Sequence, residues 1–576
     1  MISFFSFLPG KQSHAPSLLA IAYIMLPILG CHQEQDQQPQ ENQTITTPSW
    51  YANSVIYNLD VETFQDSDGD GRGDFRGLTR RLDYLKDLGV TAIWLAPFQP
   101  TPDQDDGYDI TDFYGIDSRL GTSADFHAFM KAAKSKNMKV LMDLVINHTS
   151  VEHPWFKAAR ADTTSVYHKW YVWAKKQPKD FAKGMVFPGV QNETWTYDEP
   201  AKSYYFHRFY DFQPDLNFQN EQVREMAISV LTYWLKQGMD GFRLDAVPFV
   251  IDIPETGARD PAHMYRILTR LNAAVKKVNT EAILLGEANV TADENAEYFG
   301  KDATRLKMMF NFYANQHLFY ALAKNDPASY IKAMREFRFK PSQAQWVYFL
   351  RNHDEIDLKR LSNTQRGYVF ERFGPEPTMQ IYERGIRRRL APMLADTRLL
   401  RMAYSILFSS PGAQMIRYGE EIGMGDDLTL RERLSVRTPM QWDTSANAGF
   451  SHGAGTFRPV IAYGDYSFQK INVRMQSGQH GSLLEFVRKM ISLRNQHPEI
   501  GLGSWEIYQS AELLMMEYKY KDKHLLTVHN FQPEQADLQL PKELREKYDF
   551  MPLLSTAHPD RLEPHGFQWF DLKIKQ

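Results

Sequence analysis

The stretch VLMDLVINH, residues 140–148, is a short run of mostly aliphatic residues that ends in Asn147 and His148. A run of this length, bounded by polar residues, is typical of a buried β-strand. Seven similar runs alternate with longer amphipathic segments, which predicts βα units and a parallel sheet. The eight runs lie at residues 55–57, 92–95, 140–146, 241–244, 283–285, 309–312, 347–350 and 414–416. This number favours a closed (β/α)8 barrel over an open doubly wound sheet.

Two regions depart from the repeat of strand and helix. Roughly a hundred residues separate the third run from the fourth, far more than one crossover needs, so we expect a small inserted domain at about residues 149–212. After about residue 480, one helical segment precedes segments that alternate apolar and polar residues between turns, which predicts a compact antiparallel β domain. The expected division is a barrel at residues 50–480 and a last barrel helix with this β domain at residues 481–576.

The N-terminal sequence predicts an export signal followed by a polar tether. An apolar run at residues 18–29 leads into Ile28-Leu-Gly-Cys31. The run is too short to span a membrane and is typical of a signal peptide, and its end resembles a bacterial lipoprotein cleavage site at which Cys31 would carry the lipid. Residues 32–49 are polar, as in a solvated tether. We therefore expect a leader at residues 1–31 and an extracytoplasmic protein, in the bacterial periplasm or at the cell surface, that meets a membrane only through its lipid anchor.

Composition and charge exclude several classes of function. The chain has 43% hydrophobic and 24% charged residues, as soluble globular proteins do. With a net charge of −4, the chain has no overall positive field that would attract nucleic acid, so a neutral small molecule is the expected partner. No feature of the sequence predicts an oligomeric state. The single cysteine allows neither a disulfide framework nor thiolate chemistry. No glycine loop followed by Lys and Ser or Thr is present to cradle phosphates, so no organic cofactor is predicted.

Charged residues gather at the carboxyl ends of several predicted strands, where active sites lie in barrel enzymes. These residues are Asp143, His148, Arg243, Asp245, Glu287, His353 and Asp354. A glycosidic bond can be cleaved by one carboxylic acid that protonates the leaving oxygen and one carboxylate that attacks the sugar carbon. Arg243 can keep Asp245 ionised, and apolar neighbours can keep Glu287 protonated. A lone carboxylate at a strand end is commonly a helix cap or ion-pair partner, but this alternative explains the whole ordered set poorly.

Six motifs follow one another along the chain. They are GYDI at 107–110, DLVINH at 143–148, QPDLNF at 213–218, GFRLDAV at 241–247, LLGEA at 284–288 and FLRNHDE at 349–355. Together they resemble the conserved regions of the α-amylase superfamily, glycoside hydrolase family 13. The resemblance implies a TIM barrel with an inserted domain after the third strand, a C-terminal β-sandwich and a retaining mechanism. It makes Asp245 the nucleophile, Glu287 the acid/base and Asp354 the residue that binds the sugar hydroxyls.

The same resemblance implies a set of substrate-binding residues. They are Asp105, Tyr108, His148, Arg243, His353 and Arg437. Tyr108 would stack beneath the reacting glucose, with His148, Arg243 and His353 around it. Asp105 and Arg437 resemble the acid and base that close the pocket in exo-acting relatives, so short sugars are expected.

A glycine-rich loop, DSDGDGRGD at residues 66–74, has carboxylates at alternate positions, which suits a hard cation with oxygen ligands. Asp-Gly loops are also common as simple turns, and Gly77 stands where an EF-hand would have its closing Glu. In related glucosidases this loop binds calcium. The resemblance therefore implies a Ca²⁺ ion held by Asp66, Asp68, Asp70, Asp74 and the carbonyl of Arg72.

Later motifs indicate a branch of the superfamily. Within the trehalose synthase, oligo-1,6-glucosidase and α-glucosidase group, RTPMQWD at 437–443 and NAGFS at 447–451 look most like trehalose synthase, although RTPMQW alone is shared with α-glucosidases and sucrose isomerases. Ala246, directly after Asp245, resembles the residue at this position in enzymes that act on α-1,4 links. Asp60 and Asn289-Val-Thr291 depart from the usual trehalose synthase pattern. We expect hydrolysis of α-1,4-linked glucose oligosaccharides such as maltose, with transfer to another sugar as a variant. Isomerisation of maltose to trehalose is the second expectation. A non-catalytic sugar-binding relative is a remote third, because the carboxylate set is intact.

Overall fold

The computed structural model describes residues 49–251, 261–510, 512–554 and 560–575. The expected leader, with Cys31, and all but the last residue of the expected tether lie outside the described residues. Within the described part of the chain, no helix is long and apolar enough to cross a membrane.

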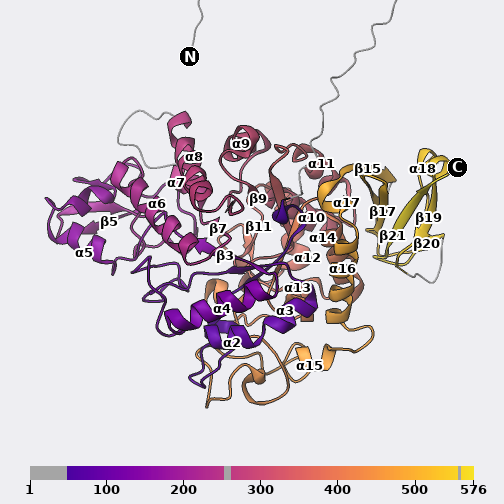
Figure 1. Ribbon diagram of the computed structural model, residues 1–576, viewed down its shortest axis with the longest axis horizontal. Helices are drawn as coiled ribbons and strands as arrows, with labels where there is room; N and C mark the ends of the chain where they lie inside the picture. The colour runs from indigo at the N-terminus through magenta and orange to yellow at the C-terminus, as the bar shows by residue number, and fades with distance from the viewer. Residues whose placement is uncertain (1–48, 252–260, 511, 555–559, 576) are drawn as a thin grey trace, which may run out of the picture. The chain divides into compact units, whose positions relative to one another are not determined.

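Eight parallel strands close into a barrel (Figure 1). In their order around the barrel they are β1 (Val55–Leu59), β14 (Ala413–Arg417), β10 (Gln345–Phe349), β9 (Met308–Phe310), β8 (Ile283–Gly286), β7 (Gly241–Leu244), β3 (Lys139–Leu144) and β2 (Ala92–Leu95). The strands are buried almost throughout, because helices cover the barrel outside and side chains fill it inside. The predicted barrel is confirmed, and each strand end lies within two residues of the predicted run.

Helices connect the strands and cover them. The longer ones are α4 (Ser123–Ser135), α6 (Glu221–Lys236), α8 (Pro261–Val278), α10 (Phe312–Lys324), α11 (Ala328–Glu336), α12 (Asn363–Phe373), α14 (Thr397–Ser409) and α16 (Leu483–Gln496). Shorter ones are α1 (Val61–Phe64), α2 (Phe75–Arg80), α3 (Leu82–Leu88), α7 (Val247–Ile251), α9 (Ala292–Phe299), α13 (Leu390–Leu394), α15 (Val473–Gln476) and α17 (Glu499–Leu502). In α6, the Asn220 side chain caps the first turn, and Val223, Val230 and Trp234 recur at helical spacing on the buried face.

An inserted domain follows β3, as predicted. It contains α5 (Pro154–Ala161) and an antiparallel sheet in the order β4 (Trp173–Ala174), β6 (Ser203–Phe206), β5 (Trp195–Asp198). Val172, Trp195 and Phe206 form its small core. The insertion leaves and returns at the end of β3, where Leu216 N donates to the Asn147 carbonyl at 2.8 Å. It therefore borders the face of the barrel at which β3 ends.

A second small sheet follows β10, in the order β11 (Ile356–Asp357), β13 (Gly385–Ile386), β12 (Gln380–Ile381). Ile381 of β12 and the next residue, Tyr382, pack against Phe187 of the inserted domain. The loops after β3 and β10 therefore meet above the barrel.

The C-terminal region is antiparallel, as predicted. Its main sheet has the order β15 (Ser504–Ser510), β16 (Leu513–Tyr520), β17 (Lys523–Asn530), β21 (Phe567–Ile574), β19 (Tyr548–Pro552). The pair β18 (Ala536–Asp537) and β20 (Arg561–Leu562), together with α18 (Lys542–Lys547), covers one face through a core that includes Leu544 and Leu562. The other face packs on α14, where Trp569 Nε1 donates to Ser405 Oγ at 2.9 Å.

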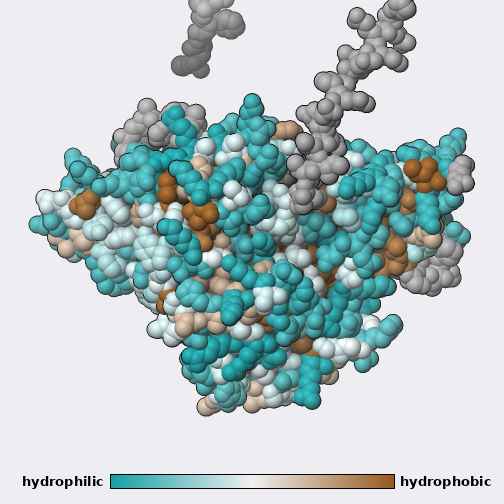
Figure 2. Space-filling view, viewed as in Figure 1, coloured by the Kyte–Doolittle hydropathy of each residue, from teal (hydrophilic) through white to brown (hydrophobic). Residues whose placement is uncertain are grey.

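The side of the molecule turned toward the viewer in Figure 2 has a mostly hydrophilic surface. Hydrophobic residues lie in separate spots on the described part of this surface.

Candidate active site

A cavity of about 520 Å³ lies where the barrel strands end. Asp245 follows β7, Glu287 follows β8 and Asp354 follows β10, and all three line this cavity. Parallel strands of a barrel end at one face, so residues just beyond their carboxyl ends converge there. The structure thus brings together the three carboxylates that the sequence singles out.

Arg243 connects two of these carboxylates. It is 1% exposed, and its Nη1 donates to Asp245 Oδ1 at 2.6 Å while Nη2 lies 2.6 Å from Glu287 Oε1. Nη1 also donates to Asp143, its neighbour in register on β3. The backbone turns sharply after Asp245, because Ala246 has a φ of 48°, and Ala246 N donates to Glu287 Oε2 at 3.1 Å. One guanidinium therefore fixes both members of the expected catalytic pair.

The environment shifts the acidities of this pair. Burial raises the pKa of Glu287 to about 7, against the lowering effect of Arg243, and the charges of Asp245 and Asp354 raise it further. Burial also raises the pKa of Asp245, again opposed by Arg243. Two interacting carboxyl groups of this kind titrate as a unit. Near neutral pH the pair can therefore hold one proton, which is what an acid and a nucleophile together require.

Asp354 has the opposite environment. Burial alone would raise its pKa, but His353, Arg433, Arg437 and Arg243 together hold it well below the usual range. Its Oδ1 accepts hydrogen bonds from Arg433 Nη1 and Arg437 Nη2, both at 3.0 Å. Asp354 is therefore ionised at any ordinary pH and suited to accept hydrogen bonds from sugar hydroxyls.

Tyr108 and two histidines complete the base of the cavity. The Tyr108 hydroxyl lies 2.5 Å from His353 Nε2, and their rings stack with centroids 5.5 Å apart. His148 Nε2 lies 3.0 Å from the Tyr108 carbonyl. Burial lowers the pKa of His148 to about 4 and holds that of His353 well below its usual value. Both imidazoles are therefore neutral hydrogen-bonding groups at pH 7.

The end of the cavity beside Asp105 differs from the expected arrangement. Asp105 pairs with Arg433, on a short 3-10 helix at Glu432–Val436, and Gln213 Nε2 donates to Asp105 Oδ2 at 3.0 Å. Arg433 lines the cavity and bridges Asp105 to Asp354. Arg437 is 1% exposed and lies behind the wall, where its Nη1 donates to Asp106 Oδ2 at 2.6 Å. No motif in the sequence distinguishes Arg433 from the other arginines of this segment.

An aromatic wall is a second feature without a clear sequence signal. Phe187 lines the cavity and packs on Tyr382 and Tyr210, with ring centroids 4.5 and 4.9 Å apart. Both tyrosine hydroxyls donate to Glu432 Oε2, which is the residue before Arg433. The wall joins the inserted domain to the loop after β10. No short motif announces it, because its members come from distant segments.

The loop at residues 66–74 is compact. Carboxylate oxygens of Asp66, Asp68 and Asp74 lie within 4.8 Å of one another, and this donor set fits a hard cation; Asp70 is not in the group. Much of the loop is also held by its own backbone, since Asp66 Oδ1 accepts from Gly69 N at 2.7 Å. The Arg72 side chain points away from this group and pairs with Glu62 and Asp103.

The two departures from the trehalose synthase pattern have structural partners. Asp60 accepts from Arg417 at the end of β14, with Oδ1 at 2.9 Å from Nη1. Asn289 Nδ2 donates to Asp357 Oδ2 at 2.7 Å, and both residues line the cavity. Each residue thus belongs to a buried or half-buried polar contact.

Comparisons with known proteins agree with this geometry. A family model described as "Alpha amylase, catalytic domain" matches residues 59–375 and 383–503. A trehalose synthase of Thermus thermophilus is 38% identical over 91% of this chain, which spans only 56% of that longer protein. A trehalose synthase of Pimelobacter sp. is 36% identical over 91% of this chain and 96% of its own length. The solved structure of an α-glucosyl transfer enzyme, XgtA, matches 92% of this chain and 100% of its own with a TM-score of 0.75 at 25% identity. This chain is therefore a member of the α-amylase family, glycoside hydrolase family 13, and an enzyme of its glucosidase type.

Proposed function

We propose that this enzyme interconverts maltose and trehalose by moving a glucosyl unit through a covalent bond to Asp245. The observation that carries the proposal is that a complete carboxylate set lines the cavity of a chain similar along 91% of its length to two proteins named trehalose synthase. Hydrolysis, the first expectation from the sequence, has less support than isomerisation, the second.

In the proposed reaction, the glucosyl unit is transferred twice, first to Asp245 and then to the freed glucose. Protonated Glu287 gives its proton to the glycosidic oxygen of maltose while Asp245 attacks the anomeric carbon, which breaks the glycosidic bond and forms a glucosyl ester. The freed glucose stays in the cavity and reorients, so that its anomeric hydroxyl faces the glucosyl ester. Glu287, now ionised, takes a proton from the anomeric hydroxyl of the freed glucose. The oxygen of that hydroxyl attacks the anomeric carbon of the glucosyl ester, which breaks the bond from this carbon to the Asp245 oxygen and releases the Asp245 carboxylate. Two displacements at one carbon retain the α configuration.

The other residues bind and orient the sugar. Asp354, ionised beside Arg433 and Arg437, would accept from sugar hydroxyls, whose hydrogen bonds strengthen as the ring distorts. The Asp105–Arg433 pair would close the non-reducing end, so that only one glucose unit fits there. The cavity volume is in the usual range for small-molecule sites.

We also propose that loop 66–74 holds a structural Ca²⁺ ion through Asp66, Asp68 and Asp74, with Asp70 and the Arg72 carbonyl as further ligands. Such an ion would neutralise clustered carboxylates and so stabilise the folded loop. It would supply no step of the reaction.

The test is incubation of the purified full-length protein with maltose, and separately with trehalose, followed by chromatography of the products over time. Trehalose formed from maltose with little free glucose, and maltose formed from trehalose, would support isomerisation. Glucose as the only product from maltose would overturn it and make the enzyme an α-glucosidase.

A further inference from the structure

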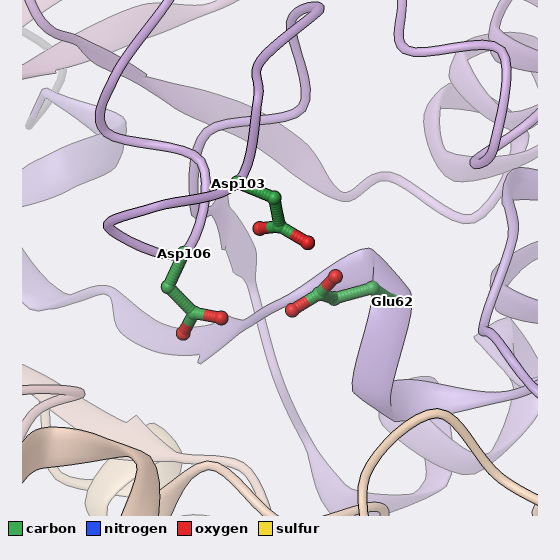
Figure 3. A group of neighbouring side chains, drawn as sticks. All are labelled: Glu62, Asp103 and Asp106. Atoms are coloured by element: carbon green, nitrogen blue, oxygen red, sulfur yellow. The ribbon is translucent and has the colours of Figure 1, made fainter. Parts of the chain in front are cut away.

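A cluster of charged residues lies behind the active-site cavity. The carboxyl groups of Glu62 on α1 and of Asp103 and Asp106 on the loop after β2 face one another (Figure 3). Their spacing alone would suit a cation. Four arginines already lie within ion-pair distance of them, namely Arg72, Arg119, Arg437 and Arg458. Each carboxylate of the cluster is therefore already paired with arginine, so the cluster is an ion-pair network and not a metal site.

Arg458 lies at the centre of this network and is 8% exposed. Its Nη2 pairs with Asp106 Oδ1 at 2.5 Å and lies 3.4 Å from Glu62 Oε1. Its Nη1 donates to the backbone carbonyl of Arg437 at 2.7 Å. Arg458 thus contacts the Arg437 backbone directly and reaches the Arg437 side chain through Asp106.

Arg437 carries the network to the active site. Nη1 pairs with Asp106 Oδ2 at 2.6 Å, and Nη2 pairs with Asp354 Oδ1 at 3.0 Å. Nε donates to the His353 carbonyl at 2.9 Å, next to Asp354 in the chain. Every nitrogen of this guanidinium therefore has a fixed partner, and two of the three partners hold the Asp354 segment. A planar guanidinium held on two sides has little freedom left to lose when substrate binds.

We propose that Arg458 is a positioning residue for Asp354, acting through Asp106 and Arg437 without lining the substrate cavity. The proposal rests on the proposed function only in that Asp354 binds the sugar. With Arg458 replaced, the Arg437 carbonyl loses a donor and Asp106 loses one of two cations. Arg437 can then shift toward Asp106, and Asp354 loses one of the two donors that fix its Oδ1.

The experiment compares Arg458→Gln, Arg458→Lys and Asp106→Asn with the matched control Arg338→Gln, in which an exposed ion pair with Glu506 is removed. Full-length variants are assayed for kcat and KM on maltose, trehalose and 4-nitrophenyl α-glucoside, and melting temperatures are recorded. Crystal structures of the wild type and of each folded variant give the position of the Asp354 carboxylate.

We expect Arg458→Gln and Asp106→Asn to lower kcat/KM about tenfold or more, mainly through kcat, because the sugar contacts of Asp354 strengthen in the transition state. Arg458→Lys, which keeps the charge, should recover most of this loss, and Arg338→Gln should resemble the wild type. The Asp354 carboxylate should be displaced in Arg458→Gln.

Wild-type kinetics in folded Arg458→Gln, or an activity loss with Asp354 unmoved, would overturn the proposal. If Arg458→Gln does not fold, Asp106→Asn decides by the same two criteria. If the wild type turns over none of the three glucosides, the proposed function fails, and the position of Asp354 in the crystals still decides the positioning role.

Discussion

Nη1 of Arg243 lies 2.6 Å from Oδ1 of Asp245, at the point where β7 ends. The same guanidinium contacts Glu287 through Nη2. The acid and the nucleophile are therefore not independent groups, because one buried cation stabilises the ionised form of each. Arg243 therefore influences the protonation of Asp245 and Glu287 as well as their positions.

Replacing the nucleophile should abolish turnover. Asp245→Asn keeps the shape of the side chain but cannot form the glucosyl ester, so we expect kcat on maltose to fall by about 10⁴-fold or more. Circular dichroism and the melting temperature should stay near those of the wild type, which shows that the fold is kept. A variant that retains a tenth of wild-type activity would contradict the assigned role.

Weakening the shared cation should move the pH profile. Arg243 lowers the pKa of both Asp245 and Glu287, against the dominant effect of burial. In Arg243→Lys a single ammonium cannot bridge both carboxylates, so both pKa values should rise and Asp245 should stay protonated to higher pH. The acidic limb of the profile of kcat/KM against pH should therefore move to higher pH. The maximal kcat/KM should fall about a hundredfold. An unchanged limb in a folded variant would show that Arg243 does not set the pair's acidity.

The barrel and its carboxylates could be predicted because their signals are local. Each strand is a short apolar run, and Asp245, Glu287 and Asp354 each follow directly after such a run or its first turn. Because all strands of a parallel barrel run in the same direction, residues that follow their carboxyl ends lie at one face. Residues that are far apart along the chain, such as Asp245 and Asp354, therefore lie close together in space.

The walls of the cavity could not be predicted in the same way. Asp105 and Arg433 are 328 residues apart, and their contact depends on how two irregular loops pack. Arg437, which the resemblance pairs with Asp105, is only one helical turn further on, and no local pattern distinguishes it from Arg433. Phe187 and Tyr382 likewise meet only because the inserted domain folds over the loop after β10.

Removing a bound cation should destabilise the enzyme. If Asp66, Asp68 and Asp74 hold Ca²⁺, then excess chelator should lower the melting temperature by about 2 °C or more, and added Ca²⁺ should restore it. Asp68→Asn should have a lower melting temperature than the wild type in Ca²⁺ and respond less to chelator. Identical melting curves with chelator and with Ca²⁺ would show that the loop is held by its own hydrogen bonds.

Opening the end of the cavity beside Asp105 should change the preferred chain length. Arg433→Ala removes the partner of Asp105 and one donor to Asp354. We expect KM for maltose to rise severalfold, while activity on maltotriose increases relative to maltose, because a further glucose unit gains space. Competition assays with both sugars measure this ratio. Arg398→Ala, which removes an exposed ion pair with Asp396 outside the cavity lining, is the control and should keep the wild-type preference.

The aromatic wall should decide how much water reaches the glucosyl ester. Phe187 is 3% exposed and packs between Tyr382, Tyr210 and the guanidinium of Arg433. Phe187→Ala should leave a void beside the cavity at a cost of about 3–5 kcal/mol in unfolding free energy, so Phe187→Leu serves as the milder variant. Water admitted through this void competes with the retained glucose for the ester, and the ratio of free glucose to trehalose made from maltose should rise.

The matched control is Phe339→Ala, because Phe339 is 72% exposed and its removal should leave both the ratio and the melting temperature unchanged. Product analysis at equal maltose consumption separates a change in partitioning from a change in rate. If Phe187→Leu and Phe187→Ala both fold and keep the wild-type ratio, the wall does not exclude water. Retention of the freed glucose must then depend on other parts of the cavity lining, such as the hydrogen-bonded pair Asn289 and Asp357.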